Sequence, residues 1–442
     1  MRPSRAVQSA RPSVRIPVRH LTSSSRLPVL APFGVKSFRF QWPADLAASW
    51  AFEMESLILG WYVLTTTGSV RLLVVYGALQ WAGSLISPMF GVAGDRLGHR
   101  TILCITRAVY VALAGTLTVL MLTGHLVPWH VFGIAALTGL LRPSDMVMRN
   151  ALIGQTMSPA QLLGALAISR TTAESARMVG ALAGTGGVAL FGMGPAYVIV
   201  TALYCTSFCL SFGLAGKATR VAGAAGAVAV SIVATPLRDL RLAFTYVWGK
   251  PAILGAVTLA FLVNMLAYPF ALGLMPYIAK DVFAVGQTGL GYLAASFAAG
   301  GLGGSILLSV SRVPLRAART MLLCAATWFV LVLALAWTRG LMAGMVLLAI
   351  TGVVQTFCLM PLAAVMLRAS DADYRGRVMG MRMLGVAGLP LGLLIAGPLI
   401  SAIGFTATVV LFAVSGLALT AAIAWRWHAA LWHRGAVANV RA

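Results

Sequence analysis

The sequence predicts an all-α membrane protein whose twelve transmembrane helices form two pseudo-symmetric six-helix halves. The 442-residue chain is 60% hydrophobic and only 10% charged, whereas a soluble domain carries about 25% charged residues. Its apolar residues form uninterrupted runs close to the roughly 20 residues that a helix needs to cross a bilayer. A weak internal repeat relates the two parts of the chain. These three features together indicate a polytopic membrane protein.

The apolar runs define the predicted helices in chain order. Six fall in the first half of the chain, at Pro43–Thr66, Val70–Phe90, Thr101–Leu122, Trp129–Asn150, Leu162–Leu190 and Pro195–Leu214. Six more fall in the second half, at Ala252–Val282, Thr288–Val310, Thr320–Trp337, Leu341–Leu367, Val378–Ile400 and Phe405–Trp425. Polar residues separate consecutive runs, as expected for loops at a membrane surface.

The longest connection divides the chain into its two halves. The predicted domains are a basic disordered tail at 1–40, a first half at 41–214, a cytoplasmic linker at 215–251, a second half at 252–426 and a basic tail at 427–442. An organellar transit peptide and a start codon placed too early are alternatives for the first segment. In the linker, Pro236–Lys250 places its apolar residues on one helical face, which predicts an amphipathic helix at the membrane surface.

Two arginines carry the internal repeat. A shift of 212 residues aligns Arg170 with Arg382, and both lie inside apolar segments. Two halves related by an axis along the membrane normal leave parallel repeats of this kind.

The distribution of positive charge predicts the orientation in the membrane. The net charge of +23 comes from basic residues in the tails and in alternate loops, so it follows membrane topology and does not indicate a nucleic-acid partner. The loops on the opposite side hold only Arg71, Lys280 and Arg339. We therefore expect a multi-pass protein of a cell membrane, most simply the bacterial inner membrane, with both termini in the cytoplasm.

A polar loop follows the second apolar run and is rich in glycine and charge. It reads Gly-x-x-x-Asp-Arg-x-Gly-x-Arg over residues Gly91–Arg100. This pattern resembles the signature loop between helices two and three of major facilitator superfamily transporters. The resemblance implies a solute carrier in which the loop latches the inner side shut against the start of helix eleven, through Gly91, Asp95, Arg96, Gly98 and Arg100. A loop that is basic only for topology is the alternative.

Shorter motifs are similar to one subgroup of that superfamily. Gly60-Trp61, Ala176-Arg177-x-x-Gly180 and Arg375-Gly376-Arg377-Val378 resemble the subgroup of enterobactin and macrolide exporters. The glycine-rich stretch after Gly180 resembles the antiporter motif of drug exporters, with Ala181 where that motif has proline. The resemblance implies alternating access and proton-coupled export of a small organic molecule.

Charged residues within the bilayer are costly, so each is a functional-site hypothesis. Glu53 and Glu55 lie in the first helix, two residues and about 200° apart, so only one of them can face a central cavity. Arg170, Glu174 and Arg177 share one face of the fifth helix. We expect Glu174, with Glu53 or Glu55, to carry the proton; a locked network of ion pairs is the alternative.

The fourth predicted helix adds a second group of charges. Pro143 is expected to kink or break this helix, and Asp145 to pair with Arg142, Arg149 or an arginine of the loop between the second and third helices. Arg142 resembles the helix-four arginine of proton-driven exporters. We assign all three charged residues to the same network as Arg170, Arg177 and Arg382.

The second half offers candidate substrate-binding residues. Asn264 and Tyr268 lie one turn apart on the seventh helix, which Pro269 and Pro276 would interrupt, and irregular helices at membrane depth line cavities or packed interfaces. Arg382 has no acid nearby in sequence, so it needs a partner from another helix or an anionic substrate.

No catalytic constellation accompanies these charges. The sequence has no nucleophile–base pair, zinc signature or nucleotide fingerprint, so we expect no enzyme activity, cofactor or metal. The predicted protein is a monomeric secondary transporter, an exporter coupled to protons. A facilitator or proton-symport importer, or a sensor or scaffold without transport, are alternatives. Its substrate is not encoded by any local motif.

Overall fold

The computed structural model describes residues 28–86, 97–214, 244–310, 316–371 and 374–432, and the regular elements among them are helices. The described elements of the first half are two short 3-10 helices, η1 and η2, and six α-helices. In chain order they are η1 (Pro28–Gly34), α1 (Lys36–Thr67), α2 (Val70–Leu79), η2 (Ala82–Ile86), α4 (His99–Leu122), α5 (Pro128–Thr156), α6 (Pro159–Phe191) and α7 (Met193–Ser211). Gly68, at φ 64°, ends α1 in a left-handed conformation that suits glycine.

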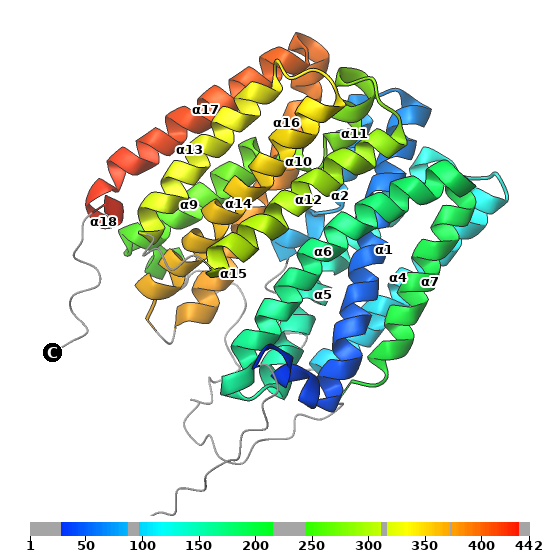
Figure 1. Cartoon of the computed structure of the whole chain (residues 1–442), viewed down its shortest axis with the longest axis horizontal. Coiled ribbons are helices and arrows are strands. Elements are labelled where there is room, and N and C mark those ends of the chain that lie inside the picture. Colours follow the sequence, from blue (N-terminus) through cyan, green and yellow to red (C-terminus); the bar gives the residue numbers. More distant parts are fainter. Residues whose placement is uncertain (1–27, 87–96, 215–243, 311–315, 372–373, 433–442) are drawn as a thin grey trace, which may run out of the picture.

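The second half follows the same plan with more interruptions. Its elements are α9 (Pro251–Leu266), α10 (Tyr268–Ala271), α11 (Met275–Tyr277), η3 (Ile278–Val282), α12 (Gln287–Val310), α13 (Ala317–Leu335), α14 (Leu341–Ala369), α15 (Arg375–Val386), α16 (Gly388–Ile403), α17 (Phe405–Arg426) and α18 (His428–Trp432). In Figure 1 these helices gather on one side of the molecule, and α1, α4, α6 and α7 on the other. The prediction of an all-helical fold in two halves is confirmed.

Length and composition agree with a membrane-spanning bundle. Seven of the described helices are long and apolar enough to cross a bilayer: α4, α5, α7, α12, α13, α14 and α17. The remaining predicted spans correspond to α1 and α6, which carry the acidic residues Glu53 and Glu174, and to α2, α9 and the α15–α16 pair, which are short or interrupted. Large hydrophobic side chains such as Trp129, Leu190 and Trp425 remain exposed on the outer surface, where a bilayer would cover them.

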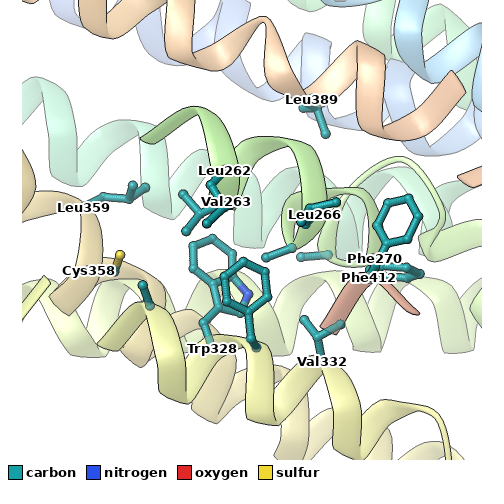
Figure 2. Packing of buried hydrophobic residues seen from close by; sticks show 14 of the residues in the cluster. Leu262, Val263, Leu266, Phe270, Trp328, Val332, Cys358, Leu359, Leu389 and Phe412 are labelled. Carbon is teal, nitrogen blue, oxygen red and sulfur yellow. The ribbon is translucent and has the colours of Figure 1, made fainter. Parts of the chain in front are cut away.

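Each half has its own apolar core. In the second half, Trp328 of α13 is fully buried and packs among residues of α9, α10 and α14, as Figure 2 shows with Val263, Phe270 and Leu359. In the first half, residues of α1, α4, α5 and α7 form a separate cluster around Tyr197. The cluster of the second half also includes Val74 and Ala78 of α2 and Ala181 of α6, so it extends across the contact between the halves.

Small residues bring the halves together at one end, the end where α1 finishes and α2 begins. Here α2 packs on α16 and α6 packs on α12. A Cβ added to Gly397 would lie 2.3 Å from Val74, and one added to Gly291 would lie 1.8 Å from the hydroxyl of Thr185. Glycine is therefore needed at both positions for the backbones to approach this closely. We call this the closed end.

The structure departs from the predicted helices at two places. The predicted eleventh helix is divided at Ala387 into α15 and α16. Pro143 does not break its helix, because α5 continues from Pro128 to Thr156 through it. Only the N–H at position 143 is lost, and membrane helices tolerate such a loss where neighbouring helices pack closely. Most of the predicted amphipathic helix at Pro236–Lys250 lies outside the described residues, except for a helical segment at 244–248.

Candidate functional site

A cavity of about 400 Å³ lies between the two halves. Helices α1, α4, α5, α6 and α7 of the first half and α9, α14, α15 and α16 of the second half line it. Its charged lining residues are five arginines and three carboxylates: Arg142, Arg149, Arg170, Arg177, Arg382, Glu53, Asp145 and Glu174. This volume lies in the range of small-molecule sites, and the charged lining carries a net positive charge.

Glu174 is the central carboxylate of this cavity. It is 4% exposed, and its oxygens lie 3.1 Å from Nη2 of Arg170 and 3.0 Å from Nη1 of Arg177. Gly301 of α12 lies directly opposite, since a Cβ there would be 3.3 Å from Oε2 of Glu174. The carboxylate therefore sits where the two halves meet.

The two acids of α1 point in different directions. Glu53 lines the cavity, and its Oε1 lies 3.7 Å from Nε of Arg177. Glu55 is buried away from the cavity and accepts hydrogen bonds from Tyr197 at 2.7 Å and Tyr204 at 2.6 Å, both on α7. Of the two acids of α1, only Glu53 lines the cavity in this conformation.

A second ion-pair network lies where α1 and α4 begin and α5 and α7 end. Arg107 of α4 is 1% exposed, pairs with Asp45 of α1 and lies 3.5 Å from Asp145 of α5. It also donates a 2.7 Å hydrogen bond to Ser211 of α7. Asp145 is 3.0 Å from Arg149 on its own helix. The sequence analysis did not identify Arg107 or Asp45, although both are charged residues in or at the edge of apolar runs.

Arg142 does not take part in that network. Its guanidinium lies against two aromatic rings, 3.2 Å from the centre of Phe52 and 4.3 Å from that of Trp81. Its Nη1 is buried and donates no hydrogen bond within the described part of the chain. Cation–π contacts thus hold the side chain beside the cavity without neutralising its charge.

The second-half candidates form the opposite wall. Asn264 lines the cavity while its amide donates to Ala260 of its own helix at 2.8 Å. The Tyr268 hydroxyl accepts a hydrogen bond from Gln355 of α14. Arg382 is half-buried on α15, and the structure gives it no ion pair with any described residue.

The predicted latch is only partly described. Gly91, Asp95 and Arg96 lie outside the described residues. Gly98 has φ 88° and caps the start of α4, and Arg100 donates a 2.7 Å hydrogen bond to the carbonyl of Phe212 after α7.

One surface contact joins the linker end to the second half. The Tyr246 hydroxyl donates a 2.8 Å hydrogen bond to Asp371, and Lys250 lies 3.5 Å from the same carboxylate. The hydrogen bond, with a smaller contribution from Lys250, lowers the pKa of Asp371. This contact anchors the chain just before α9 to the connection that follows α14.

The chemistry of the cavity is electrostatic. Among the described residues no group of three or more His, Cys, Asp or Glu side chains could hold a metal ion. Charged groups that exchange partners can bind an ionic ligand or a proton, and their placement between two halves allows such binding to change how the halves pack.

Comparisons with known proteins agree with this architecture. No curated protein sequence matches the chain. A solved bacterial homolog of the human lysosomal transporter Spinster, inward-facing and unoccupied, is 13% identical with a TM-score of 0.68, over 89% of this chain and 97% of that one. The peptide transporter POT in complex with alafosfalin is 15% identical with a TM-score of 0.67, over 92% and 98%.

The nucleoside transporter NupG is 16% identical with a TM-score of 0.63, over 88% of this chain and 99% of that one. These likenesses show a shared fold. The sequence model described as Major Facilitator Superfamily matches residues 42–386. The chain therefore belongs to the major facilitator superfamily.

Proposed function

We propose that this membrane transporter works by alternating access and couples the movement of a small organic molecule to protons, with Glu174 as the proton site. The single observation that carries the proposal is the position of Glu174. It lines the central cavity, it is paired with two arginines, and it lies against α12 of the other half.

Protonation of Glu174 would change the forces between the halves. The charged carboxylate is stabilised by Arg170 and Arg177, while burial opposes its charge. A proton on Glu174 removes the counter-charge of both arginines, which can then interact with water, substrate or Glu53. A ligand that binds two conformations unequally shifts the equilibrium between them, and a proton at this interface meets that condition.

The decisive variant is Glu174→Gln, which keeps the shape of the side chain and removes its titration. We expect transport driven by a pH gradient to be abolished in proteoliposomes, while exchange of substrate without a gradient persists. Folding is checked by the elution profile of the purified protein. Full gradient-driven transport by the variant would refute Glu174 as the proton site, and no flux by either protein would favour a sensor or scaffold.

The two acids of α1, Glu53 and Glu55, supply control variants for Glu174→Gln. We expect Glu55→Gln to retain most of the gradient-driven transport, because Glu55 hydrogen-bonds to α7 and does not line the cavity. Glu53→Gln is expected to reduce transport, because Glu53 shares Arg177 with Glu174. The reverse order of these two variants would show that the proton passes through the first-half core.

The direction that we propose is efflux. Its support is the resemblance of Gly60-Trp61 and of the motif around Arg177 to exporters. The excess of arginine favours a second candidate, uptake of an anion together with a proton. Protonation of Glu174 would release positive charge for an anion, so proton and anion would each strengthen the binding of the other. The experiment that separates efflux from uptake uses vesicles of known orientation. It measures whether an acid interior or an acid exterior drives substrate into them.

A further inference from the structure

Each carboxylate that lines the cavity forms an ion pair with at least one arginine. Glu174 is shared by Arg170 and Arg177, and Glu53 lies near Arg177. Asp145 lies between Arg149 and Arg107. Two lining arginines remain without a carboxylate partner among the described residues. These are Arg142 on α5 and Arg382 on α15, one from each half.

The position and the unpaired nitrogen of Arg142 suit the binding of an anion. Phe52 and Trp81 cover its guanidinium, so its position is fixed by packing. Glu53 acts on its charge through space, but Arg142 forms no ion pair within the described part of the chain. A buried guanidinium nitrogen without an acceptor is a costly state that an anionic ligand can relieve. A fixed, planar guanidinium offers its edge to a carboxylate or phosphate in a two-pronged contact.

Arg142 also stands at a boundary within the space between the halves. A smaller chamber of about 70 Å³ continues from the main cavity toward the closed end and shares Phe52, Glu53, Trp81 and Arg142 with it. Arg142 therefore borders both spaces, as Arg177 does.

Arg382 faces the same cavity from the opposite half. Arg170 of α6 lines the same cavity and carries a like charge. Because like charges destabilise this arrangement when no anion is present, a bound anion gains attraction from both halves at once. Such a ligand would favour the conformation in which the halves close around it.

We propose that the transported substrate is an aromatic organic anion, a carboxylate or phosphate, whose charged group supplies the missing counter-charge of Arg142 and Arg382. The aromatic part lies against Trp81, Tyr110 and Tyr268, which line the same cavity. This assignment of substrate class rests on the proposed role of the chain as a transporter, but it does not depend on proton coupling.

The test is equilibrium binding to the purified full-length protein in detergent, without a pH gradient. The probes are radiolabelled benzoate and phenyl phosphate, with uncharged benzamide as the competitor of matched shape. We expect the anions to bind more tightly than benzamide. Arg142→Gln and Arg382→Gln should each weaken anion binding by roughly tenfold or more, because each removes a charge-assisted contact, and should leave benzamide binding unchanged.

The control is Arg71→Gln at the start of α2, an exposed arginine away from the cavity, which should bind the anions as the unaltered protein does. If a glutamine variant fails to fold, Arg142→Lys and Arg382→Lys keep the charge and should show a smaller loss. Equal binding of anions and benzamide, or unchanged anion binding by the cavity variants, would overturn the proposal. Full gradient-driven transport by Glu174→Gln would refute the proton site and leave the assignment of the substrate class standing, so the two proposals fail separately.

Discussion

Replacement of Arg107 by methionine is expected to destabilise the protein by about 3–5 kcal/mol, because it leaves the buried carboxylate of Asp45 without its ion-pair partner and removes one of the two arginines beside Asp145. Arg107 is 1% exposed and connects Asp45 of α1, Asp145 of α5 and Ser211 of α7 to its own helix. Four helices of the first half therefore meet at one side chain. The measurement is the free energy of unfolding in detergent, from denaturant titration.

Two further variants decide what the loss means. Arg39→Ala removes an exposed arginine that donates a hydrogen bond to the carbonyl of Phe33 on the protein surface, and it should cost less than about 1 kcal/mol. Arg107→Met combined with Asp45→Asn should recover part of the loss, because Asp145 keeps Arg149 while Asp45 no longer carries a charge. A cost for Arg107→Met no larger than that of Arg39→Ala would mean that the network does not stabilise the fold.

The sequence predicts the helices and the halves well because both depend on local composition. A run of apolar residues long enough to cross a bilayer has few alternatives to a helix. The charge cluster of α6 could also be predicted from the sequence, because helical spacing alone places Arg170, Glu174 and Arg177 on one face. In the structure Glu174 forms ion pairs with both arginines.

Partners on different helices could not be predicted in the same way. Arg107 lies 62 positions from Asp45 and 104 from Ser211, and no spacing rule connects residues so far apart. A useful signal was present nonetheless: an arginine inside an apolar run requires an acid from some other run. Asp45, at the start of α1, was one of the few acids available.

The choice between Glu53 and Glu55 shows a second limit. Helical geometry separates the two side chains by about 200° but does not say which one faces the cavity. That depends on the packing of α1 against α6 and α7. Gly180 of α6 lets the backbone approach Glu53 closely, with a Cβ there 2.8 Å from Cβ of Glu53, while Tyr197 and Tyr204 of α7 receive Glu55.

Replacement of Gly291 by leucine is expected to reduce transport by about tenfold or more, because the side chain would separate the halves at the closed end. Even a Cβ at this position of α12 would lie 1.8 Å from the hydroxyl of Thr185 and 3.2 Å from the carbonyl of Ala181, both on α6. Most buried apolar residues of each half pack against residues of the same half, so the fold of the halves should survive. The measurements are substrate flux and maleimide labelling of a cysteine introduced at Leu57, which lines the chamber near this end.

The control for Gly291 lies on the same helix. Gly303 of α12 has no heavy atom within 4 Å of an added Cβ, so Gly303→Leu introduces the same side chain into open space and should leave flux and labelling unchanged. Labelling at position 57 should rise in Gly291→Leu alone, because a wedged interface admits the reagent. Equal behaviour of the two variants would show that closure at α6 and α12 is not a required step of transport. A rise in labelling with normal flux would show that the wedge opens this end without stopping the cycle.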